Sequence, residues 1–253
     1  MPDAHNLDGG PMGRELKGQT ALITGGSSGI GLALCRTMAA RGLRVVLTGR
    51  DPIRTHAAFL GLPGPQDHTF VVGNLAEDSF LEELTTRTLK HAGGRLGLLI
   101  HAAGVHVPKT IEASSAADFD VTFATNLRAP FLLTAQLLPA LRAARGQIVF
   151  INSSATLNPR PEVAAYTASK AGLRAFADSL RSTVNSDGIR VLSVFPGRTA
   201  TPMQQEQFAR EGREFAPGRL LQPEDVAVAT LTALTLSETA ELTEIYLRPN
   251  AQA

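Results

Sequence analysis

The sequence is short of several features, and each shortage excludes a class of protein. Its 253 residues contain one cysteine, Cys35, which has no partner for an internal disulfide and suits a reducing cytoplasm. The six histidines show no HExxH motif and no other paired spacing, so we expect no metal site. No apolar run approaches the roughly 18 residues of a membrane span, and residues 1–17 lack the apolar core of a secretory signal. These absences together predict a soluble, cytoplasmic protein.

Net charge is also nearly absent. With 24 Lys+Arg against 23 Asp+Glu, the chain carries a formal charge of +1, which offers no electrostatic footprint for nucleic acid or an anionic membrane. What is plentiful is glycine, with 23 residues that show no collagen-like period. The length suits one large α/β domain or two small ones. The positions of the glycines therefore become the useful question.

Short apolar runs alternate with longer amphipathic segments from residue 19 to the end of the chain. We interpret residues 1–15 as a disordered tail or a cloning remnant, and residues 16–253 as one domain. The predicted strands are short and rich in Val, Ile and Leu: Thr20–Thr24, Arg44–Thr48, Thr69–Val72, Gly97–His101, Gln147–Asn152, Arg190–Phe195 and Thr243–Leu247. The predicted helices keep one apolar face: Ile30–Arg41, Phe80–His91, Ala116–Ala144, Ala164–Asn185 and Pro223–Leu236. Strand–helix alternation predicts an α/β protein with a Rossmann fold, a doubly wound parallel sheet of about seven strands with helices on both faces.

A glycine-rich loop follows the first predicted strand and leads directly into a helix. Glycines there let the backbone turn sharply and approach a pyrophosphate, and the helix N-terminus offers free N–H groups and the positive end of its dipole. The spacing G-x-x-x-G-x-G is not the commoner G-x-G-x-x-G, and by itself it could be simple turn chemistry. Its place between strand and helix favours nucleotide binding by Thr24, Gly25, Ser27, Ser28, Gly29, Ile30 and Gly31.

The end of the second strand bears on the choice of dinucleotide. An acidic residue here usually binds the ribose hydroxyls of NAD, whereas an arginine favours the 2′-phosphate of NADP. No acid occurs before Asp51, and Arg50 precedes it. The sequence therefore predicts NADP as the cofactor, with NAD as the alternative. If Arg50 has no role in binding, it is simply a solvated arginine at the end of the strand. The serines of the glycine loop and Arg54 are expected to add secondary phosphate contacts.

Tyr166 and Lys170 begin a predicted helix four residues apart, so they lie on one face of it. An ammonium group near a phenol lowers the phenol pKa from about 10 toward working pH, as a general acid/base requires. Y-x-x-x-K alone is common on helices, but this one follows a strand that ends just before Ser153 and Ser154. The carboxyl ends of parallel strands meet at the ligand crevice. A serine hydroxyl there can donate to a substrate carbonyl oxygen and stabilise the charge that develops on it.

In this order and spacing the motifs resemble those of a short-chain dehydrogenase/reductase, over residues 19–247. Residues 24–31 match the family's TGxxxGxG loop. Ser153 stands at the family's usual distance of thirteen positions before the tyrosine, and Ser154 is one position too close. Asn126 matches the asparagine of the family's tetrad. The segment after the sixth strand matches the one that holds the nicotinamide carboxamide, through Pro196, Gly197, Thr199 and Thr201.

The resemblance implies hydride transfer between NADP(H) and a carbonyl or secondary alcohol, in the manner of a carbonyl reductase. Tyr166 would exchange the hydroxyl proton, while Lys170 would lower its pKa and hold the nicotinamide ribose. Ser153 would orient the carbonyl, and Asn126 would support a proton relay behind the lysine. The catalytic set implied is thus Asn126, Ser153, Tyr166 and Lys170.

The chain departs from the family's pattern at three places. After the fourth strand His101 replaces an asparagine, which we interpret as a structural substitution rather than a catalytic histidine, while Ala103 and Gly104 still permit approach to the adenine ribose. Asn74 and Leu75 stand where an aspartate commonly contacts the adenine amino group, and the amide oxygen can accept the same bond. Residues 244–249 lack the usual glycine-rich ending, which puts assembly through that edge in doubt.

Substrate contacts are expected from Ser153 and from the segment after Gly197, which includes Met203. Arg198, or Arg160 in the loop before Tyr166, is a candidate for binding a substrate carboxylate, but we favour the interpretation of each as an ordinary surface arginine. The helices at 116–144 and 164–185 are rich in alanine on more than one face. In the family such helices pair across a homodimer, often within a homotetramer; alternatively they are core helices.

Two other function classes share parts of this pattern. One is a non-catalytic NADP-binding sensor or regulator on the same fold, since fold alone does not determine function. The other is a different Rossmann enzyme, such as a methyltransferase, which shares the glycine loop but has no use for the Ser–Tyr–Lys set. A small-molecule carbonyl or alcohol remains the expected substrate, and no nucleic acid or membrane partner is expected.

Overall fold

The computed structural model describes residues 13–64 and 67–250. Most of the predicted tail, residues 1–12, lies outside the described residues. The part of it that is described packs on the protein, because the backbone N–H of Arg14 donates to the carbonyl oxygen of Leu236 at 3.4 Å and the next apolar residue, Leu16, is buried.

A seven-stranded sheet forms the centre of the molecule, and all its neighbouring strands are parallel. The strand order is β3-β2-β1-β4-β5-β6-β7, so the chain changes direction across the sheet between β1 and β4, where ligands bind in folds of this kind. The predicted Rossmann fold is confirmed, and each strand begins and ends within one residue of its predicted bounds: β1 (Thr20–Thr24), β2 (Arg44–Gly49), β3 (Thr69–Val72), β4 (Leu98–His101), β5 (Gln147–Ile151), β6 (Arg190–Pro196) and β7 (Glu244–Leu247).

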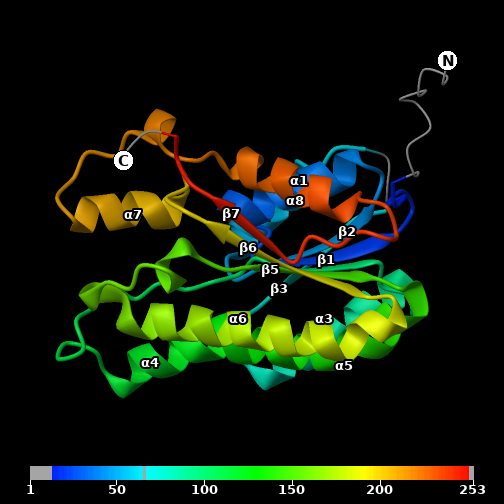
Figure 1. Ribbon diagram of the computed structural model, residues 1–253, viewed down its shortest axis with the longest axis horizontal. Coiled ribbons are helices and arrows are strands. Elements are labelled where there is room, and N and C mark those ends of the chain that lie inside the picture. Colours follow the sequence, from blue (N-terminus) through cyan, green and yellow to red (C-terminus); the bar gives the residue numbers. More distant parts are fainter. Residues whose placement is uncertain (1–12, 65–66, 251–253) are drawn as a thin grey trace, which may run out of the picture.

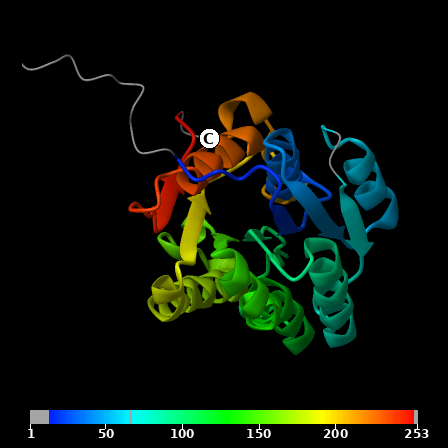
Figure 2. The same ribbon diagram turned by 90° about the vertical axis from the view of Figure 1, so that its right-hand side faces the viewer.

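Helices cover both faces of the sheet, with α1 and α8 on one and α3, α5 and α6 on the other (Figure 1). Figure 2 shows the same two layers from the side. The bounds are α1 (Gly29–Ala40), α2 (Pro52–Leu60), α3 (Asp78–Ala92), α4 (Ala116–Phe123), α5 (Ala129–Ala144), α6 (Ala164–Val184), α7 (Pro202–Arg210) and α8 (Pro223–Leu234). Within the described residues, none of these helices combines the length and apolarity that crossing a membrane requires.

Two hydrophobic cores lie on the two faces of the sheet. Alternate strand residues point to opposite faces, so Leu22 and Ile23 in β1 belong to different cores. Ile23 packs in the core beneath α1 and α8, with Leu34 and Leu231. Leu22 packs in the core that α3, α5 and α6 close, with Leu137 and others. Burial on both faces is why the strands read as continuous apolar runs.

Three features of the helices differ from the predictions. The helix predicted over 116–144 is interrupted by a π-helical turn, η2 (Ala124–Arg128), which separates α4 from α5. The short helices α2 and α7 were not predicted. Both begin with a side-chain cap followed by proline, at Asp51 before α2 and Thr201 before α7, which is a start signal that the sequence does contain.

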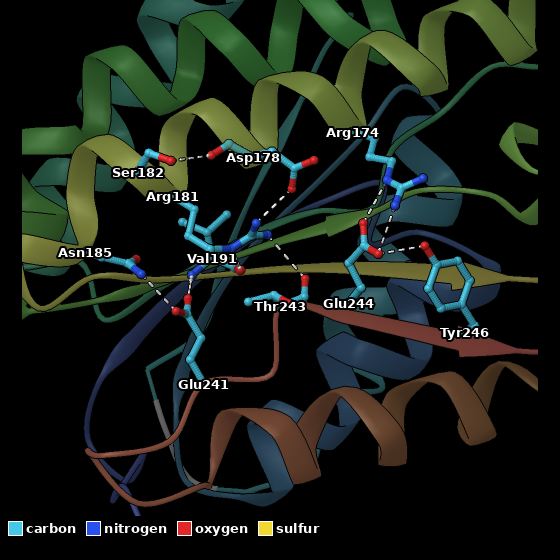
Figure 3. A network of polar contacts seen from close by, with 10 residues as sticks. All are labelled: Arg174, Asp178, Arg181, Ser182, Asn185, Val191, Glu241, Thr243, Glu244 and Tyr246. Atoms are coloured by element: carbon cyan, nitrogen blue, oxygen red, sulfur yellow. Dashed lines mark hydrogen bonds and ion pairs between the residues drawn. The ribbon is translucent and has the colours of Figure 1, made fainter.

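The edge strand β7 is fastened to α6 and β6 by polar side chains (Figure 3). The Arg174 guanidinium donates to both carboxylate oxygens of Glu244, at 2.8 and 3.1 Å, and the Tyr246 hydroxyl donates to the same carboxylate at 2.7 Å. Arg181 donates to the carbonyl oxygen of Thr243 at 3.3 Å. These contacts hold β7 in register beside the strand whose end reaches the candidate active site.

Candidate active site

Two cavities lie side by side at the carboxyl ends of the strands. One, of about 400 Å³, is a groove that follows the glycine loop and the ends of β2, β3 and β4. The other, of about 390 Å³, lies between the end of β6, the loop before α6, and α7. Three residues line both cavities: His106, Tyr166 and Met203. The phenol of Tyr166 is thus placed where the contents of the two cavities meet.

The glycines of the loop allow its backbone to pack tightly against neighbouring backbone. Gly25 has φ +69°, and a Cβ placed there would lie 2.7 Å from the Cα of Ala103. A Cβ on Gly31 would lie 2.1 Å from the carbonyl oxygen of Gly25, so the turn closes only with glycine there. The N-cap residue Ser28 makes no side-chain hydrogen bond to the first turn of α1, and that turn holds no acidic residue. Its N–H groups and positive dipole end therefore suit the pyrophosphate of a dinucleotide.

Arg50 is exposed at the end of β2, where it lines the groove. Its neighbour Asp51 accepts from the backbone N–H of Arg54 at 2.9 Å and from the Arg54 guanidinium at 3.0 Å. That carboxylate therefore already has a cationic partner, whereas Arg50 has none among the described residues. The uncompensated charge at this corner of the groove belongs to Arg50.

Most of the residues predicted to bind the cofactor line the groove: Gly25, Ser27, Ser28, Gly29, Ile30, Gly31, Arg50, Asn74, Leu75, Ala103, Gly104, Tyr166, Lys170 and Thr201. Four others lie elsewhere. Pro196 and Gly197 line the second cavity. Thr24 and Thr199 line neither cavity. Both are buried, and their hydroxyls form hydrogen bonds with backbone groups. Thr24 Oγ1 accepts from the N–H groups of Ala102 and Ala103, both at 3.2 Å, and Thr199 Oγ1 donates to the Gly197 carbonyl at 3.0 Å.

Lys170 lies one helical turn after Tyr166 and reaches the groove. Its Nζ donates to the carbonyl oxygen of Ile151 at 2.8 Å. A Cβ placed on Gly104 would lie 3.7 Å from this Nζ and 3.5 Å from Asn126 Oδ1, so the ammonium and the amide flank the same glycine. Burial lowers the pKa of Lys170 to about 8.

Asn126 lies in the π-helical turn and bonds two segments at once. Its Oδ1 accepts from the N–H of Val105 at 2.8 Å, and its Nδ2 donates to the Val105 carbonyl at 3.0 Å. Nδ2 also donates to Ser169 Oγ at 3.0 Å, and this hydroxyl donates to the Tyr166 carbonyl at 2.7 Å. Asn126 thereby ties the chain after β4 to the first turn of α6.

The phenol of Tyr166 faces opposing influences. Burial raises its pKa, and a hydrogen bond with Ser153 acts in the other direction. Burial is the larger of the two effects, so the pKa of Tyr166 is raised overall. The lowering of this pKa by Lys170 stays a prediction, and the Lys170 ammonium already donates to Ile151. Ser153 Oγ accepts from the N–H of Ala155 at 3.1 Å, and its own hydrogen serves the bond with Tyr166.

His101 lies in β4, away from the lining of both cavities. Its ring stacks on Phe150 with centroids 5.0 Å apart, and its Nε2 lies 3.0 Å from the hydroxyl of Thr134. Burial, followed by the charge of Lys170, lowers its pKa to about 3, so the ring is neutral. This placement supports the structural interpretation of His101.

Asn74 lines the groove as predicted, with both ends of its amide in use. Its Nδ2 donates to Glu77 at 3.1 Å, and its Oδ1 accepts from the N–H of Ala76 at 3.1 Å. The oxygen can accept a second bond.

The family model described as short chain dehydrogenase matches residues 19–212, which include every motif of the site. The chain belongs to the short-chain dehydrogenase/reductase family. An uncharacterized short-chain type dehydrogenase/reductase of Sinorhizobium fredii is 33% identical over 92% of this chain and 92% of its own. An L-fucose dehydrogenase of Bos taurus is 29% identical, over 95% of this chain and 92% of its own.

Solved structures agree with this assignment. A metagenomic short-chain oxidoreductase, crystallised in complex with NADP, superposes with a TM-score of 0.80 and is 30% identical over 94% of this chain and 100% of its own. This short-chain dehydrogenase/reductase therefore belongs to an oxidoreductase family. The metagenomic relative in that family binds NADP.

His106 is among the lining residues of the short-chain dehydrogenase/reductase site that sequence reasoning missed. His106 meets the Tyr166 ring edge-on, with centroids 4.9 Å apart and planes at 84°. Burial lowers its pKa to about 4, and the charges of Arg160 and Arg210 act in the same direction. Its position five residues beyond the end of β4, at the carboxyl edge of the sheet, was the available signal.

Proposed function

We propose that this protein is an NADP(H)-dependent oxidoreductase that interconverts a carbonyl compound and a secondary alcohol, with Tyr166 as general acid/base. The observation that carries the proposal is the position of Tyr166 between the two cavities. Lys170 lines the groove on one side of it, and Ser153 lines the second cavity on the other. A proton donor, a cation and a hydroxyl thus converge on the place where a carbonyl would meet a cofactor.

The groove is proposed to hold the dinucleotide. The first turn of α1 would bind its pyrophosphate, and Gly25 and Ala103 both line the groove. Lys170 would donate to the nicotinamide ribose from the end of its side chain. When bound, the nicotinamide supplies or accepts a hydride.

Reduction also requires a proton at the carbonyl oxygen. The Tyr166 hydroxyl donates it, since the raised pKa of the phenol keeps it protonated at neutral pH. The Ser153 hydroxyl donates a hydrogen bond to the same oxygen and stabilises the negative charge that grows there. The Lys170 ammonium stabilises the phenolate that remains. Alcohol oxidation runs through the same groups in reverse, with Tyr166 accepting the proton.

Asn126 and Ser169 act through the backbone rather than on the substrate. Their hydrogen bonds fasten the first turn of α6, which carries Tyr166 and precedes the turn that carries Lys170. We assign Asn126 to positioning this turn and to the relay behind Lys170.

NADP is proposed over NAD because of Arg50. Its guanidinium is exposed beside the groove and has no anionic partner among the described residues, so a 2′-phosphate can bind it without displacing another contact. The relative solved with NADP supports this choice.

We propose that the protein assembles as a homodimer or homotetramer through α4 and α5. These helices expose two phenylalanines, Phe119 and Phe131, which are 47% and 51% accessible. Exposed aromatic side chains on neighbouring helices are typical of an interface. The lone Cys35 is buried in the core, which suits a protein of the reducing cytoplasm.

The decisive test is a library of ketones and aldehydes offered with NADPH and with NADH, followed by the loss of nicotinamide absorbance. We expect turnover with NADPH for at least one carbonyl class. Tight NADPH binding with no turnover of any carbonyl or alcohol would overturn the enzyme assignment in favour of a sensor on this fold. Failure to bind either dinucleotide would overturn the cofactor assignment itself.

A further inference from the structure

The second cavity has walls of one sign of charge. Its lining includes two charged residues, Arg160 and Arg198, and no carboxylate of the described residues lines it. The other residues that line it are apolar or neutral, among them His106, Ser153 and Tyr166. The pKa of His106 lies well below neutrality, so the ring adds no charge at neutral pH.

Behind this wall a single carboxylate, that of Glu211, faces three guanidinium groups. Arg198 Nη2 donates to both its oxygens, at 3.1 and 3.0 Å. Arg213 donates at 3.2 Å, and Arg160 Nη1 lies 3.6 Å away. Gln207 adds a hydrogen bond at 2.8 Å. The single negative charge of Glu211 therefore balances one of the three arginine charges, and two positive charges remain without a counter-charge beside the cavity.

The three arginines are not equally held. The guanidinium groups of Arg198 and Arg213 lie over the ring of Phe208, at 4.8 and 4.9 Å from its centroid, and both are hydrogen-bonded to Glu211. Arg160 has only the longer 3.6 Å ion pair among the described residues, and its side chain is 46% accessible. It is therefore the arginine that can turn to a ligand in the cavity while the other two stay in place.

Several donors and acceptors at this wall also lack partners. Arg198 Nη1 and Gln207 Oε1 are both buried without a hydrogen bond among the described residues. Buried polar atoms without partners are costly. One arginine paired with Glu211 would be enough to fasten α7 to the loop before α6. Each further guanidinium group there adds charge repulsion, which a bound anion would relieve.

We propose that the substrate carries a carboxylate, which binds Arg160 beside Arg198 while the carbonyl of the same molecule lies at Ser153 and Tyr166. The inference rests on the proposed function, because it names the substrate class of that site: short oxo acids and the corresponding hydroxy acids. A cavity of about 390 Å³ with arginine at one wall and the Tyr166 hydroxyl at another suits a small molecule with both groups.

Binding tests the inference without any turnover. The NADPH complex of the Tyr166→Phe variant is titrated calorimetrically with butanoate and with its neutral counterpart, butanamide. We expect the carboxylate to bind at least about tenfold more tightly than the amide. Adding Arg160→Gln to the variant should remove most of that difference. Adding Arg213→Gln should leave it within about twofold, since Arg213 shares Glu211 but does not line the cavity.

Equal binding of the two compounds would overturn the inference. So would an equal effect of the two arginine substitutions, because it would show that the cluster only fastens α7. Rescue by Arg160→Lys, which restores the charge without the planar fork, would support a direct role in binding.

Kinetics separate this inference from the proposed function. The acids 2-oxobutanoate and 4-oxopentanoate are compared with their methyl esters as substrates with NADPH. We expect kcat/KM to favour an acid over its ester, and Arg160→Gln to lower that ratio at least about tenfold. Turnover of neutral ketones with no preference for acids would overturn the inference alone. Preferential carboxylate binding with no turnover of any carbonyl would overturn the proposed function, and only a carboxylate-binding site at Arg160 would remain.

Discussion

Lys170 Nζ donates to the carbonyl oxygen of Ile151 at 2.8 Å, which fastens the helix that carries Tyr166 to the end of strand β5. The contact gives the buried ammonium one polar partner inside the protein. Burial nevertheless lowers the pKa of Lys170 to about 8, so this charge is lost within the working range of an enzyme.

The first prediction concerns pH. Below pH 8 Lys170 is charged and stabilises the phenolate left when Tyr166 gives up its proton; above pH 8 that charge is lost. Because burial raises the pKa of Tyr166, the phenol itself remains protonated across this range. We expect kcat for carbonyl reduction to fall as the pH rises through about 8. Lys170→Arg, which stays charged, should move the fall to higher pH, and a flat wild-type profile between pH 7 and 9.5 would contradict the prediction.

The second prediction concerns the proton donor. Tyr166→Phe should lower kcat by about 10²–10⁴-fold, because the general acid is lost, while the Kd for NADPH changes little. The chain contains a second tyrosine, Tyr246, as a matched control. Its hydroxyl bonds Glu244 on the exposed edge strand, so Tyr246→Phe should keep turnover near wild type. Stopped-flow reduction and NADPH fluorescence measure both quantities, and a tenth of wild-type activity in Tyr166→Phe would sink the assignment.

The third prediction concerns cofactor choice. Arg50→Gln should raise the KM for NADPH about tenfold and leave the KM for NADH nearly unchanged, because only NADPH carries the phosphate. Arg41→Gln removes another exposed arginine, at the end of α1 and away from the groove lining, and should change neither value. Equal KM values for the two cofactors in the wild-type protein would refute a role for Arg50 in selection.

The fourth prediction concerns the glycine loop. A Cβ on Gly31 would lie 2.1 Å from the carbonyl oxygen of Gly25, so Gly31→Ala forces the loop open. We expect destabilisation of about 1–3 kcal/mol and an NADPH affinity reduced at least tenfold. Gly218→Ala is the control, because a Cβ there meets nothing within 4 Å. Thermal melts with and without NADPH would show the difference, and equal behaviour of the two variants would contradict it.

The fifth prediction concerns assembly. Phe131→Glu places a charge on the exposed face of α5 and should shift a dimer or tetramer toward the monomer. Ile53→Glu is the control, since Ile53 in α2 is 81% accessible but belongs to another part of the surface. Light scattering over a range of protein concentrations distinguishes the variants. A monomeric wild-type protein, or an assembly indifferent to Phe131→Glu, would exclude this face.

Much of the fold could be predicted because its signals are local. Each strand is a short run of Val, Ile and Leu between polar or glycine-containing turns, and burial on both faces makes such runs continuous. The glycine loop and the Y-x-x-x-K pair are equally local, and both reach the cavities as predicted. The short helix α7 was overlooked although Thr201 and Pro202 mark its start, because its composition is polar and its length slight.

The π-helical turn around Asn126 could not be read from its own residues. Apolar periodicity continues from α4 into α5, so the segment reads as one helix. The π-helical turn occurs together with hydrogen bonds from Asn126 to Val105 and Ser169, which are 21 and 43 positions away in the chain. Contacts of that separation have no signature in local sequence.

The sequence by itself determined the sheet, the glycine loop and the helix that carries Tyr166 and Lys170, because each depends on spacing within a few neighbouring residues. Only the tertiary structure decided the electrostatics. It buried the phenol of Tyr166, and this burial raises the pKa of that group. It also gathered Arg160, Arg198 and Arg213 around Glu211 from three separate segments. Charge and burial depend on all the neighbours of a group in space. This chain has a net charge close to zero, and yet one wall of its second cavity is positive.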